Sequence, residues 1–298
     1  MPACRYDRPK TIAEALASLT AAKGDAHVIA GGIALGILMN EKFIEPSWLI
    51  DISGIGVLRG IDVMPDRSLR IGALTTHREV EHSELVKRHV PMLAEMAAEI
   101  ACGRIKNRGT IGGNICLADP QGDPPSAVLA LRATVRAVGP KGTRDIEATD
   151  FFKGLYATAL ESDELLQEIV FPRMPRNCGI AFGKFAARHA MDYNSNIGVA
   201  VRLVVDPVSG RISDAGLGVG GVGDTAVCAR AAEAALVGNT ADAETFDAAR
   251  DALGKEINPV TDDLYSADYK RHVAASILRR TLERAHERAL ANRGTPSK

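Results

Sequence analysis

A glycine pair flanked by polar side chains is the part of this sequence whose residue types point most directly to chemistry. Residues 107–125 read NRGTIGGNICLADPQGDPP. Glycine has no Cβ, so backbone N–H groups can converge on a bound anion such as a phosphate, and a nearby carboxylate can accept from ribose hydroxyls. The stretch could therefore hold a nucleotide, although a lone glycine pair is more often a tight turn between two strands. The positions of interest are Thr110, Gly112, Gly113, Asn114, Asp119 and Asp123.

A second glycine element lies earlier in the chain. Residues 27–35 read HVIAGGIAL, in which an apolar step runs into Gly31 and Gly32 and then into a helical pattern. A strand, a glycine turn and a helix N-terminus together present N–H groups and a positive dipole end to phosphate. The pattern is neither a Walker A loop nor a GxGxxG fingerprint. Two unlike glycine elements indicate one ligand held from both sides.

A third glycine-rich segment imitates a dinucleotide motif. Residues 218–223 read GVGGVG, which matches GxGxxG, and Asp242 follows about twenty residues on, as the fingerprint requires. The strand before it is joined to the strand predicted at 197–205 by the turn DPVSG, which favours antiparallel pairing. A Rossmann unit needs a parallel crossover instead, so a nicotinamide site here is the less favoured alternative.

Composition excludes several classes of protein. The 298 residues include 36 basic and 37 acidic side chains, and a net charge of -1 gives no electrostatic case for nucleic acid or an anionic membrane. No apolar run is long enough to span a membrane, and the polar first ten residues do not resemble a secretion signal. We therefore expect a cytoplasmic protein.

Cysteine and histidine spacing predicts no metal site. The five cysteines form no CxxC pair, so we expect neither a disulfide framework nor a zinc or iron–sulfur site, but reduced and mostly buried thiols. The seven histidines show no ligand spacing, and we interpret most of them as surface or capping residues.

Hydrophobic periodicity predicts an α+β chain in two domains. The first, residues 1–176, divides at about residue 57 into a small α/β subdomain (1–57) and a larger α+β subdomain (58–176). The second, residues 177–298, follows a linker rich in proline and charge. Helices are predicted at 11–22, 35–39, 78–85, 92–100, 229–236, 241–253 and 266–291. A strand with its glycine turn is predicted at 28–32, and further strands at 48–52, 60–63, 68–71, 134–138, 143–146, 180–185, 197–205 and 212–219.

The order of four segments resembles a known family. AGG at 30–32, IGALTTH at 71–77, IKNRGTIGGN at 105–114 and the DPxxDPP step at 119–125 resemble the FAD-binding medium subunits of molybdenum hydroxylases, over nearly the whole chain. That family includes carbon monoxide dehydrogenase and bacterial xanthine dehydrogenases. The resemblance implies a two-subdomain FAD-binding domain of the PCMH (vanillyl-alcohol oxidase-like) type. A C-terminal CO-dehydrogenase-flavoprotein-like domain follows, with a three-stranded antiparallel sheet and helices.

The resemblance also implies a function. The chain would be the FAD-carrying subunit of an oxidoreductase, in which a large partner subunit hydroxylates a small substrate (N-heterocycle, aldehyde, purine or CO) at a molybdopterin centre. Electrons would cross two [2Fe-2S] clusters of a small partner subunit and leave through FAD to an external acceptor. The expected assembly is a dimer of heterotrimers. The alternatives are a self-contained flavin-dependent oxidase or reductase of the same fold, and a non-enzymatic nucleotide-binding scaffold.

Cofactor contacts can be carried over residue by residue. The resemblance implies that the glycine element at 27–35 borders the FAD pyrophosphate and that the one at 107–125 holds it from the other side. Asp123 would accept from the ribitol or ribose region, Lys184 would lie near the ring, and Tyr193 would lie beside the isoalloxazine, where it could gate access. Thr76 could reach a ligand or cap a helix. The full set is Ile29, Ala30, Gly31, Gly32, Ile33, Ala34, Thr76, Ala101, Thr110, Ile111, Gly112, Gly113, Asn114, Asp123, Leu165, Leu166, Lys184 and Tyr193.

Two departures from the family pattern concern the cofactor. AGGIAL replaces AGGTDL or AGGHSL, so a hydroxyl or carboxylate after the glycines is missing. Each lost neutral hydrogen bond is worth about 0.5–1.5 kcal/mol, so backbone donors must contribute more. DYNSN at 192–196 replaces the more apolar DYAIV type of run beside the flavin. No acid–base pair is expected to act on substrate.

Overall fold

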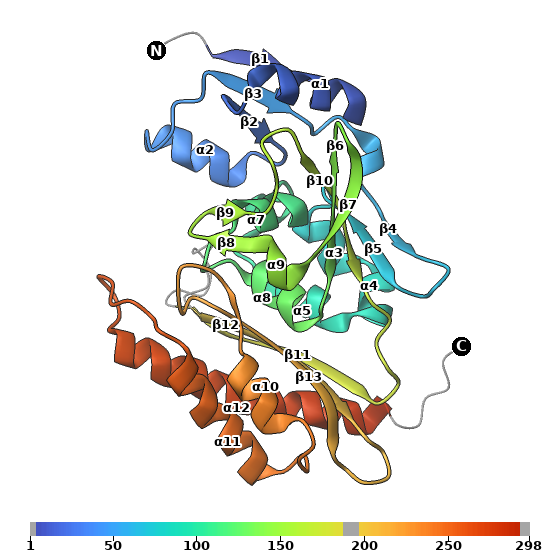
Figure 1. The fold of residues 1–298 in the computed structure, drawn as a ribbon, viewed down its shortest axis with the longest axis vertical. Coiled ribbons are helices and arrows are strands. Elements are labelled where there is room, and N and C mark those ends of the chain that lie inside the picture. The colour runs from blue at the N-terminus through green and yellow to red at the C-terminus, as the bar shows by residue number, and fades with distance from the viewer. Residues whose placement is uncertain (1–3, 187–196, 293–298) are drawn as a thin grey trace.

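Three units follow one another along the long axis of the molecule (Figure 1). The structure is a computed structural model that describes residues 4–186 and 197–292. The N-terminal unit runs from β1 to β3, the middle unit from β4 to β10, and the C-terminal unit from β11 to α12. The arrangement is the expected mixture of helices and sheets.

The N-terminal unit is a parallel sheet with one helix after each of its first two strands. Its order is β1-β3-β2, with β1 at Arg5–Asp7, β2 at Ala26–Ile29 and β3 at Trp48–Asp51. Helix α1 (Ile12–Ala22) connects β1 to β2, and α2 (Ile33–Asn40) follows β2 after only three residues. The glycines at 31–32 therefore lie at the carboxyl end of β2, where a parallel sheet presents its ligand-binding loops.

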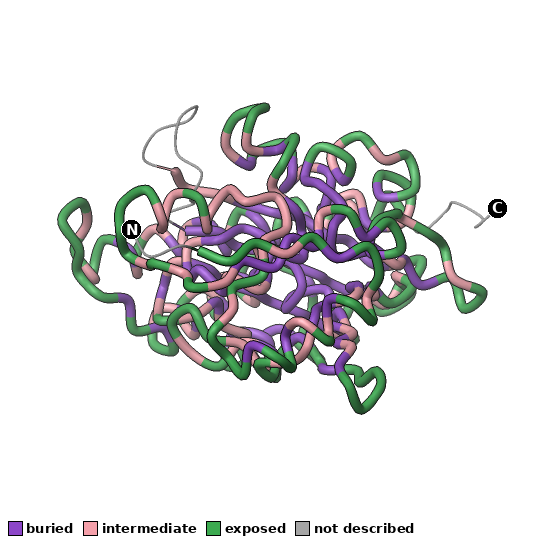
Figure 2. The backbone as a smooth tube through the Cα atoms, turned by 90° about the horizontal axis from the view of Figure 1, so that it is seen from above, coloured by how far each residue is buried: buried purple, intermediate pink, exposed green. Residues whose placement is uncertain are grey.

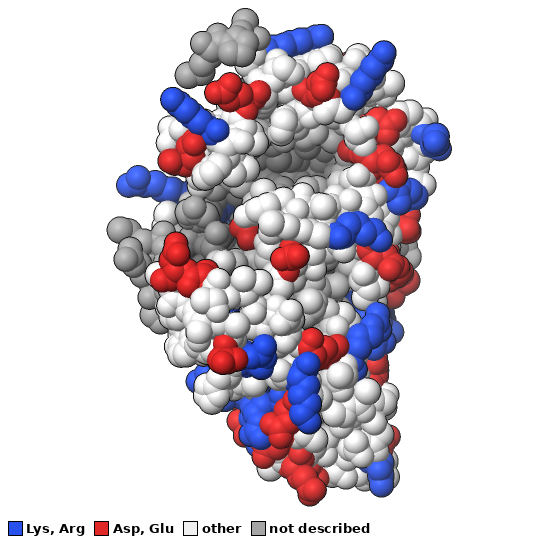
Figure 3. Space-filling model, turned by 60° about the vertical axis from the view of Figure 1, so that its left-hand side comes forward, with Lys and Arg blue, Asp and Glu red and all other residues white. Residues whose placement is uncertain are grey.

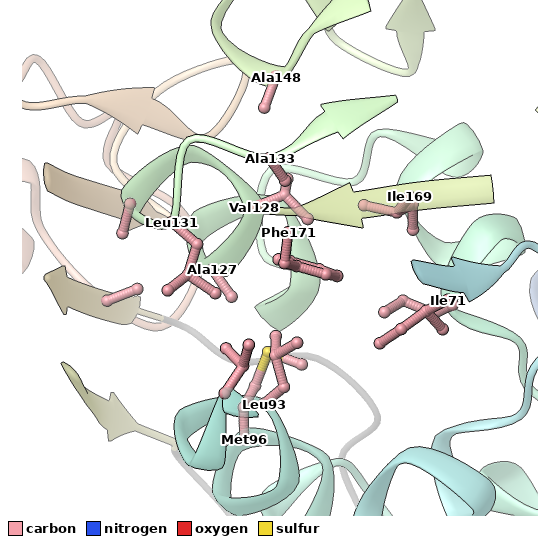
Figure 4. Packing of buried hydrophobic residues seen from close by; sticks show 14 of the residues in the cluster. Ile71, Leu93, Met96, Ala127, Val128, Leu131, Ala133, Ala148, Ile169 and Phe171 are labelled. Carbon is pink, nitrogen blue, oxygen red and sulfur yellow. The ribbon is translucent and has the colours of Figure 1, made fainter. Parts of the chain in front are cut away.

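The middle unit is a five-stranded antiparallel sheet covered on one face by short helices. Its order is β4-β5-β10-β6-β7. Figure 4 shows Leu93 and Met96 of α5 pointing toward Phe171 of β10, with Ile71 of β5 and Val128 of α8 beside them. The strands are β4 (Ile61–Val63), β5 (Leu69–Gly72), β6 (Thr134–Gly139), β7 (Gly142–Glu147) and β10 (Leu165–Phe171). The helices are α3 (His77–His82), α4 (Glu84–His89), α5 (Pro91–Glu99), α6 (Gly103–Lys106), α7 (Ile111–Leu117), α8 (Asp123–Ala130) and α9 (Ala148–Phe151).

Alternating charges cross the other face of this sheet. Arg70 on β5 bonds Asp62 on β4 (2.8 Å) and Glu168 on β10, while Arg136 on β6 bonds Glu168 (2.8 Å) and Asp145 on β7 (2.7 Å). Glu168 is 5% exposed although it is a carboxylate. A buried charge is tolerated when opposite charges bond it, so these two guanidinium groups hold the centre of the sheet together.

The C-terminal unit is an antiparallel sheet covered on both faces. The three expected long strands are β11 (Cys178–Phe185), β12 (Ile197–Val205) and β13 (Ile212–Gly220), and the two-residue β14 (Val227–Cys228) adds a short edge. Every residue of β12 is buried, because α12 (Ala267–Ala291) packs on one face and α8 on the other. The remaining helices are α10 (Arg230–Leu236) and α11 (Ala243–Glu256). Figure 2 shows buried residues running through the centre of the molecule, with the exposed loops around it.

The GxGxxG match is a packing feature of this sheet. Strand β13 is antiparallel to β12, as its turn predicted, and Asp242 caps helix α11. A Cβ on Gly216 would lie 2.1 Å from the carbonyl oxygen of Ala130, and one on Gly218 would lie 1.9 Å from that of Ser126. Glycine at these positions therefore lets α8 lie directly on the sheet.

Gly112 and Gly113 lie in helix α7, so the alternative of a tight turn between two strands does not hold for them. Two expectations were wrong. The helix predicted at 78–85 is two helices, because the Ser83 hydroxyl accepts from the N–H of Val86 and caps α4. Of the cysteines only Cys178 is buried, whereas two are exposed and two are half-buried.

No helix in the described part of the chain has the length and apolar character that a membrane span needs.

Replacing Glu168 with Gln should destabilise the protein, because it removes the carboxylate that bonds both Arg70 and Arg136 while their charges stay in place. We expect Glu168→Gln to lower the free energy of unfolding by about 2–4 kcal/mol in urea titrations. The matched control is Asp62→Asn at the exposed end of the row, for which we expect less than about 1 kcal/mol. Equal losses in the two variants would contradict the central role of Glu168.

Candidate functional site

A cavity of about 690 Å³ lies between the N-terminal and middle units. Its walls come from the β2–α2 turn, from the segment 109–117, from the start of β10 and from the hairpin formed by β8 (Phe152–Gly154) and β9 (Ala157–Thr158). Figure 3 shows a hollow below the N-terminal unit, with a visible wall of uncharged residues. The volume falls in the range of about 300–1,000 Å³ that is usual for small-molecule and cofactor sites.

Helix α2 presents an uncapped N-terminus and an apolar surface to this cavity. Gly32, with a φ of 74°, precedes the helix, and no side chain caps the first-turn N–H groups. The helix is almost entirely apolar, yet none of its residues is buried, and Ile33, Ile37 and Leu38 line the cavity. The first turn can donate to an anion, and a bound ligand would cover the apolar side chains.

The two glycine elements touch each other. A Cβ on Gly31 would lie 1.8 Å from the carbonyl oxygen of Arg108, so only glycine permits this backbone approach. The Nε of Arg108 also donates to the carbonyl oxygen of Gly31 (3.1 Å). Two segments almost eighty residues apart in sequence thus form one continuous wall.

In the glycine element at 107–125 the backbone N–H groups of Gly112, Gly113 and Asn114 are already engaged within the protein. Thr110 caps α7 by accepting from the N–H of Gly113 (3.1 Å), the N–H of Gly112 donates to Ala73 (3.0 Å), and that of Asn114 donates to Thr110 (3.0 Å). The element therefore offers polar side chains to the cavity: the hydroxyl hydrogen of Thr110 and the amide of Asn114, whose buried Oδ1 has no hydrogen-bond partner. A Cβ on Gly112 would lie 2.6 Å from that of Ala73, so Gly112 is needed for packing against the residue that follows β5.

A buried histidine also lines the cavity. His77 is 3% exposed, its ring packs against Gly109, and its Nδ1 has no hydrogen-bond partner. Burial, together with the ammonium group of Lys106, lowers the pKa of the His77 imidazole to about 4. The imidazole is therefore neutral near pH 7 and can bond a polar group of a ligand. His77 is an exception to the interpretation of most histidines as surface or capping residues.

Asp123 and Lys184 form a buried ion pair. Lys184 Nζ on β11 lies 2.8 Å from Asp123 Oδ2 at the start of α8, and it also donates to the carbonyl oxygen of Glu99 (3.1 Å). The two side chains are 6% and 2% exposed, and neither residue lines the cavity. The pair therefore joins the C-terminal sheet to α8 and α5. Asp119 does line the cavity, and burial raises the pKa of its carboxyl group.

Most of the expected cofactor contacts surround the cavity. The lining residues among them are Ile29, Ala30, Gly31, Gly32, Ile33, Ala34, Thr110, Gly112, Gly113, Asn114, Leu165 and Leu166. Thr76 instead forms a capping box with Glu79 at the start of α3, Ala101 adopts a left-handed φ of 36°, and Ile111 is fully buried. Tyr193 lies outside the described residues.

Sequence reasoning missed several lining residues, which are Phe43, His77, Ile105, Tyr156, Leu160 and Glu164. They come from four separate segments, and spacing along the chain gives no sign that these segments meet. His77 belongs to the quoted IGALTTH segment, so its place shortly after a buried strand was the one available signal.

The residues present fit a dinucleotide. The site combines an uncapped helix N-terminus, two glycine elements in contact, apolar walls and two buried polar atoms without partners, on His77 and Asn114. Nucleotide cofactors need this combination of anion donors and apolar surface. Within residues 4–186 and 197–292 no cluster of His, Cys, Asp or Glu could hold a metal ion.

Comparisons with known proteins agree with the geometry. The family model described as FAD binding domain in molybdopterin dehydrogenase matches residues 2–174, and the CO dehydrogenase flavoprotein C-terminal domain matches residues 181–285. The chain is 34% identical over 289 residues to the nicotine 6-hydroxylase medium subunit of Paenarthrobacter nicotinovorans (97% of this chain, 99% of the relative). It is 36% identical over 285 residues to the carbon monoxide dehydrogenase medium chain of Afipia carboxidovorans (95% and 97%).

Solved structures show the same similarity. A chain of carbon monoxide dehydrogenase from Hydrogenophaga pseudoflava superimposes with a TM-score of 0.92 at 36% identity, covering 97% of this chain and 99% of the other. A chain of quinoline 2-oxidoreductase from Pseudomonas putida 86 gives a TM-score of 0.89 at 30% identity, with the same coverage.

Gly31→Ala should separate the two glycine elements, because its Cβ would overlap the carbonyl group of Arg108. We expect the purified variant to carry no FAD and to lose about 1–3 kcal/mol of stability. The matched control is Gly36→Ala in α2, where a Cβ would meet no atom within 4 Å. That variant should keep its FAD and be as stable as the wild type or more stable by up to about 1 kcal/mol. Full FAD content in Gly31→Ala would contradict the contact.

The buried His77 predicts a pH dependence of stability. Its pKa is about 4 in the folded chain and 6.5 in the unfolded chain, so the unfolded state binds the extra proton between these values. As pH falls from 6.5 to 4, this group should lower the free energy of unfolding by about 3 kcal/mol. Urea titrations across this range should show a weaker pH dependence for His77→Gln than for the wild type or for the exposed control His82→Gln. Parallel curves for all three proteins would contradict the assignment.

Proposed function

Because this chain belongs to the family of FAD-binding medium subunits of molybdenum hydroxylases, we propose that it is the subunit of such a complex that transfers electrons to an external acceptor. FAD, the cofactor of the family, supplies the redox chemistry when it is bound. We propose that its electrons come from [2Fe-2S] clusters of a small partner subunit and leave to an external acceptor. The chain itself positions the cofactor and excludes water around it.

The cavity between the two glycine elements is the observation that carries this proposal. The N–H groups at the start of α2 would bind the diphosphate of FAD beside Gly31 and Gly32. The hydroxyl of Thr110 and the amide of Asn114 would bind it from the facing wall. Leu165 and Leu166 would contact the apolar parts of the cofactor. These roles follow from the groups that each wall presents.

Five of the remaining assigned residues are described and do not line the cavity: Thr76, Ala101, Ile111, Asp123 and Lys184. We propose that Asp123 faces the ribitol or ribose region from the start of α8, with Lys184 holding it in place and lying near the ring. Thr76, Ala101 and Ile111 would act by shaping the segments that they begin or join. Tyr193 would lie beside the isoalloxazine and gate access to it. The proposed domain division is 1–176, with subdomains about 1–57 and 58–176, and 177–298.

The substrate would be oxidised in another polypeptide. Relatives are named for nicotine, carbon monoxide and quinoline, so we propose a small N-heterocycle, aldehyde, purine or CO, hydroxylated at a molybdopterin centre in a large partner subunit. We propose a dimer of heterotrimers in the cytoplasm. No residue lining the cavity is required as an acid or base toward such a substrate.

Cofactor analysis of the purified chain tests this function. We expect FAD, released by acid and equimolar with the chain, and no iron or molybdenum by elemental analysis. When the chain is co-expressed with the two partner subunits, substrate should bleach the flavin absorption, whereas the chain alone should show no such reduction. Reduction of the isolated chain by an organic substrate would indicate a self-contained oxidase. Failure to take up FAD both alone and in the complex would indicate a scaffold.

A further inference from the structure

The cavity contains acidic side chains but no Lys or Arg among the described residues that line it. Asp119, Glu161 and Glu164 belong to the lining, and the two histidines in it are His27 and His77, of which His77 is neutral near pH 7. The diphosphate of a dinucleotide is anionic, so carboxylates nearby disfavour it unless positive charge is supplied. The proposed function therefore requires a source of positive potential close to the glycine turn.

The start of α2 supplies only part of that potential. Its first turn contains Ile33 and Ala34, so no hydroxyl or charged side chain reinforces the backbone N–H groups. The partial charge at a helix N-terminus attracts a nearby anion only weakly when the site is exposed to solvent.

Arg108 places a full positive charge at the same turn. Its Nε donates to the carbonyl oxygen of Gly31 (3.1 Å), and its Nη2 lies 4.0 Å from the position that a Cβ on Gly32 would occupy. The guanidinium group is therefore fixed beside the first residues of α2. Arg108 forms no ion pair with a carboxylate in the described part of the chain, whereas nearby Lys106 is paired with Glu81.

We propose that Arg108 completes the diphosphate-binding site at the turn between β2 and α2. Its Nε donates to the carbonyl oxygen of Gly31, and its remaining guanidinium N–H groups donate to the diphosphate. This role rests on the proposed function, because it assumes that FAD is the ligand. A guanidinium group presents donors in a fixed plane that matches phosphate oxygens, and its contacts with anions are stronger than neutral hydrogen bonds. Arg108 thus takes the place of the polar side chain that AGGIAL lacks.

The test compares variants that separate charge from hydrogen bonding. Arg108→Gln keeps a donor for Gly31 but removes the charge, Arg108→Lys keeps the charge, and Arg104→Gln removes a neighbouring exposed arginine as the matched control. Apoprotein is titrated with FAD and with riboflavin, which has no phosphate, at low and high salt, and binding is followed by flavin fluorescence. We expect Arg108→Gln to bind FAD about 10- to 100-fold more weakly, with a smaller salt dependence. Arg108→Lys should be intermediate, and riboflavin binding and Arg104→Gln should be unchanged.

A purely bracing role for Arg108 gives a different result. Arg108→Gln would then bind FAD as the wild type does, or would lose FAD and riboflavin equally with an unchanged salt dependence, and either result would overturn the proposal. If Arg108→Gln does not fold in urea titrations, the salt dependence of FAD binding by the wild type and Arg108→Lys decides, and its absence contradicts the proposal. Failure of the wild-type chain to bind FAD, alone and in the complex, would instead refute the proposed function.

Discussion

The cavity depends on one backbone contact, between Gly31 in the N-terminal unit and the peptide of Arg108 in the middle unit. A side chain at Gly31 would overlap the carbonyl oxygen of Arg108, so the contact exists only because Gly31 has none. It brings the end of a parallel strand, β2, against the segment that leads into α7. Each segment alone is a short turn or helix start. Together they form a wall with anion donors on one side and polar side chains on the other.

Glycine also permits close backbone approach at other contacts between helices and strands. Gly112 lets α7 approach Ala73, Gly216 and Gly218 let α8 lie on β13, and Gly179 lets α12 approach β11. In each case the carbonyl or side chain of the partner occupies the space that a Cβ would need. Glycine motifs in this chain are therefore packing devices as well as ligand-binding ones, which explains why the GxGxxG match at 218–223 carries no cofactor signature.

The described residues that line the cavity are acidic or uncharged, and the lysines and arginines near it lie outside this lining. Lys184 is paired with Asp123, and neither residue lines the cavity, whereas Arg108 lies at the turn between β2 and α2. On the outer face of the middle sheet, Glu168 is neutralised by two arginines. These pairs compensate buried carboxylates locally, because an isolated charge away from water is costly. The guanidinium group of Arg108 is held beside Gly31 and Gly32, and among the described residues it has no carboxylate partner.

The sequence by itself determined the family, the α+β class, most helices and strands, and both glycine elements, because local patterns of apolar residues, caps and glycines carry that information. It could not determine which contacts the side chains and backbone N–H groups of these segments make in the folded chain. The engagement of the Gly112 N–H depends on Ala73, a residue almost forty positions away. The pairing of Lys184 with Asp123, the burial of His77 and the meeting of Gly31 with Arg108 were likewise decided by tertiary structure. Contacts between distant segments depend on how the sheets and helices pack, and no periodicity along the chain records that packing.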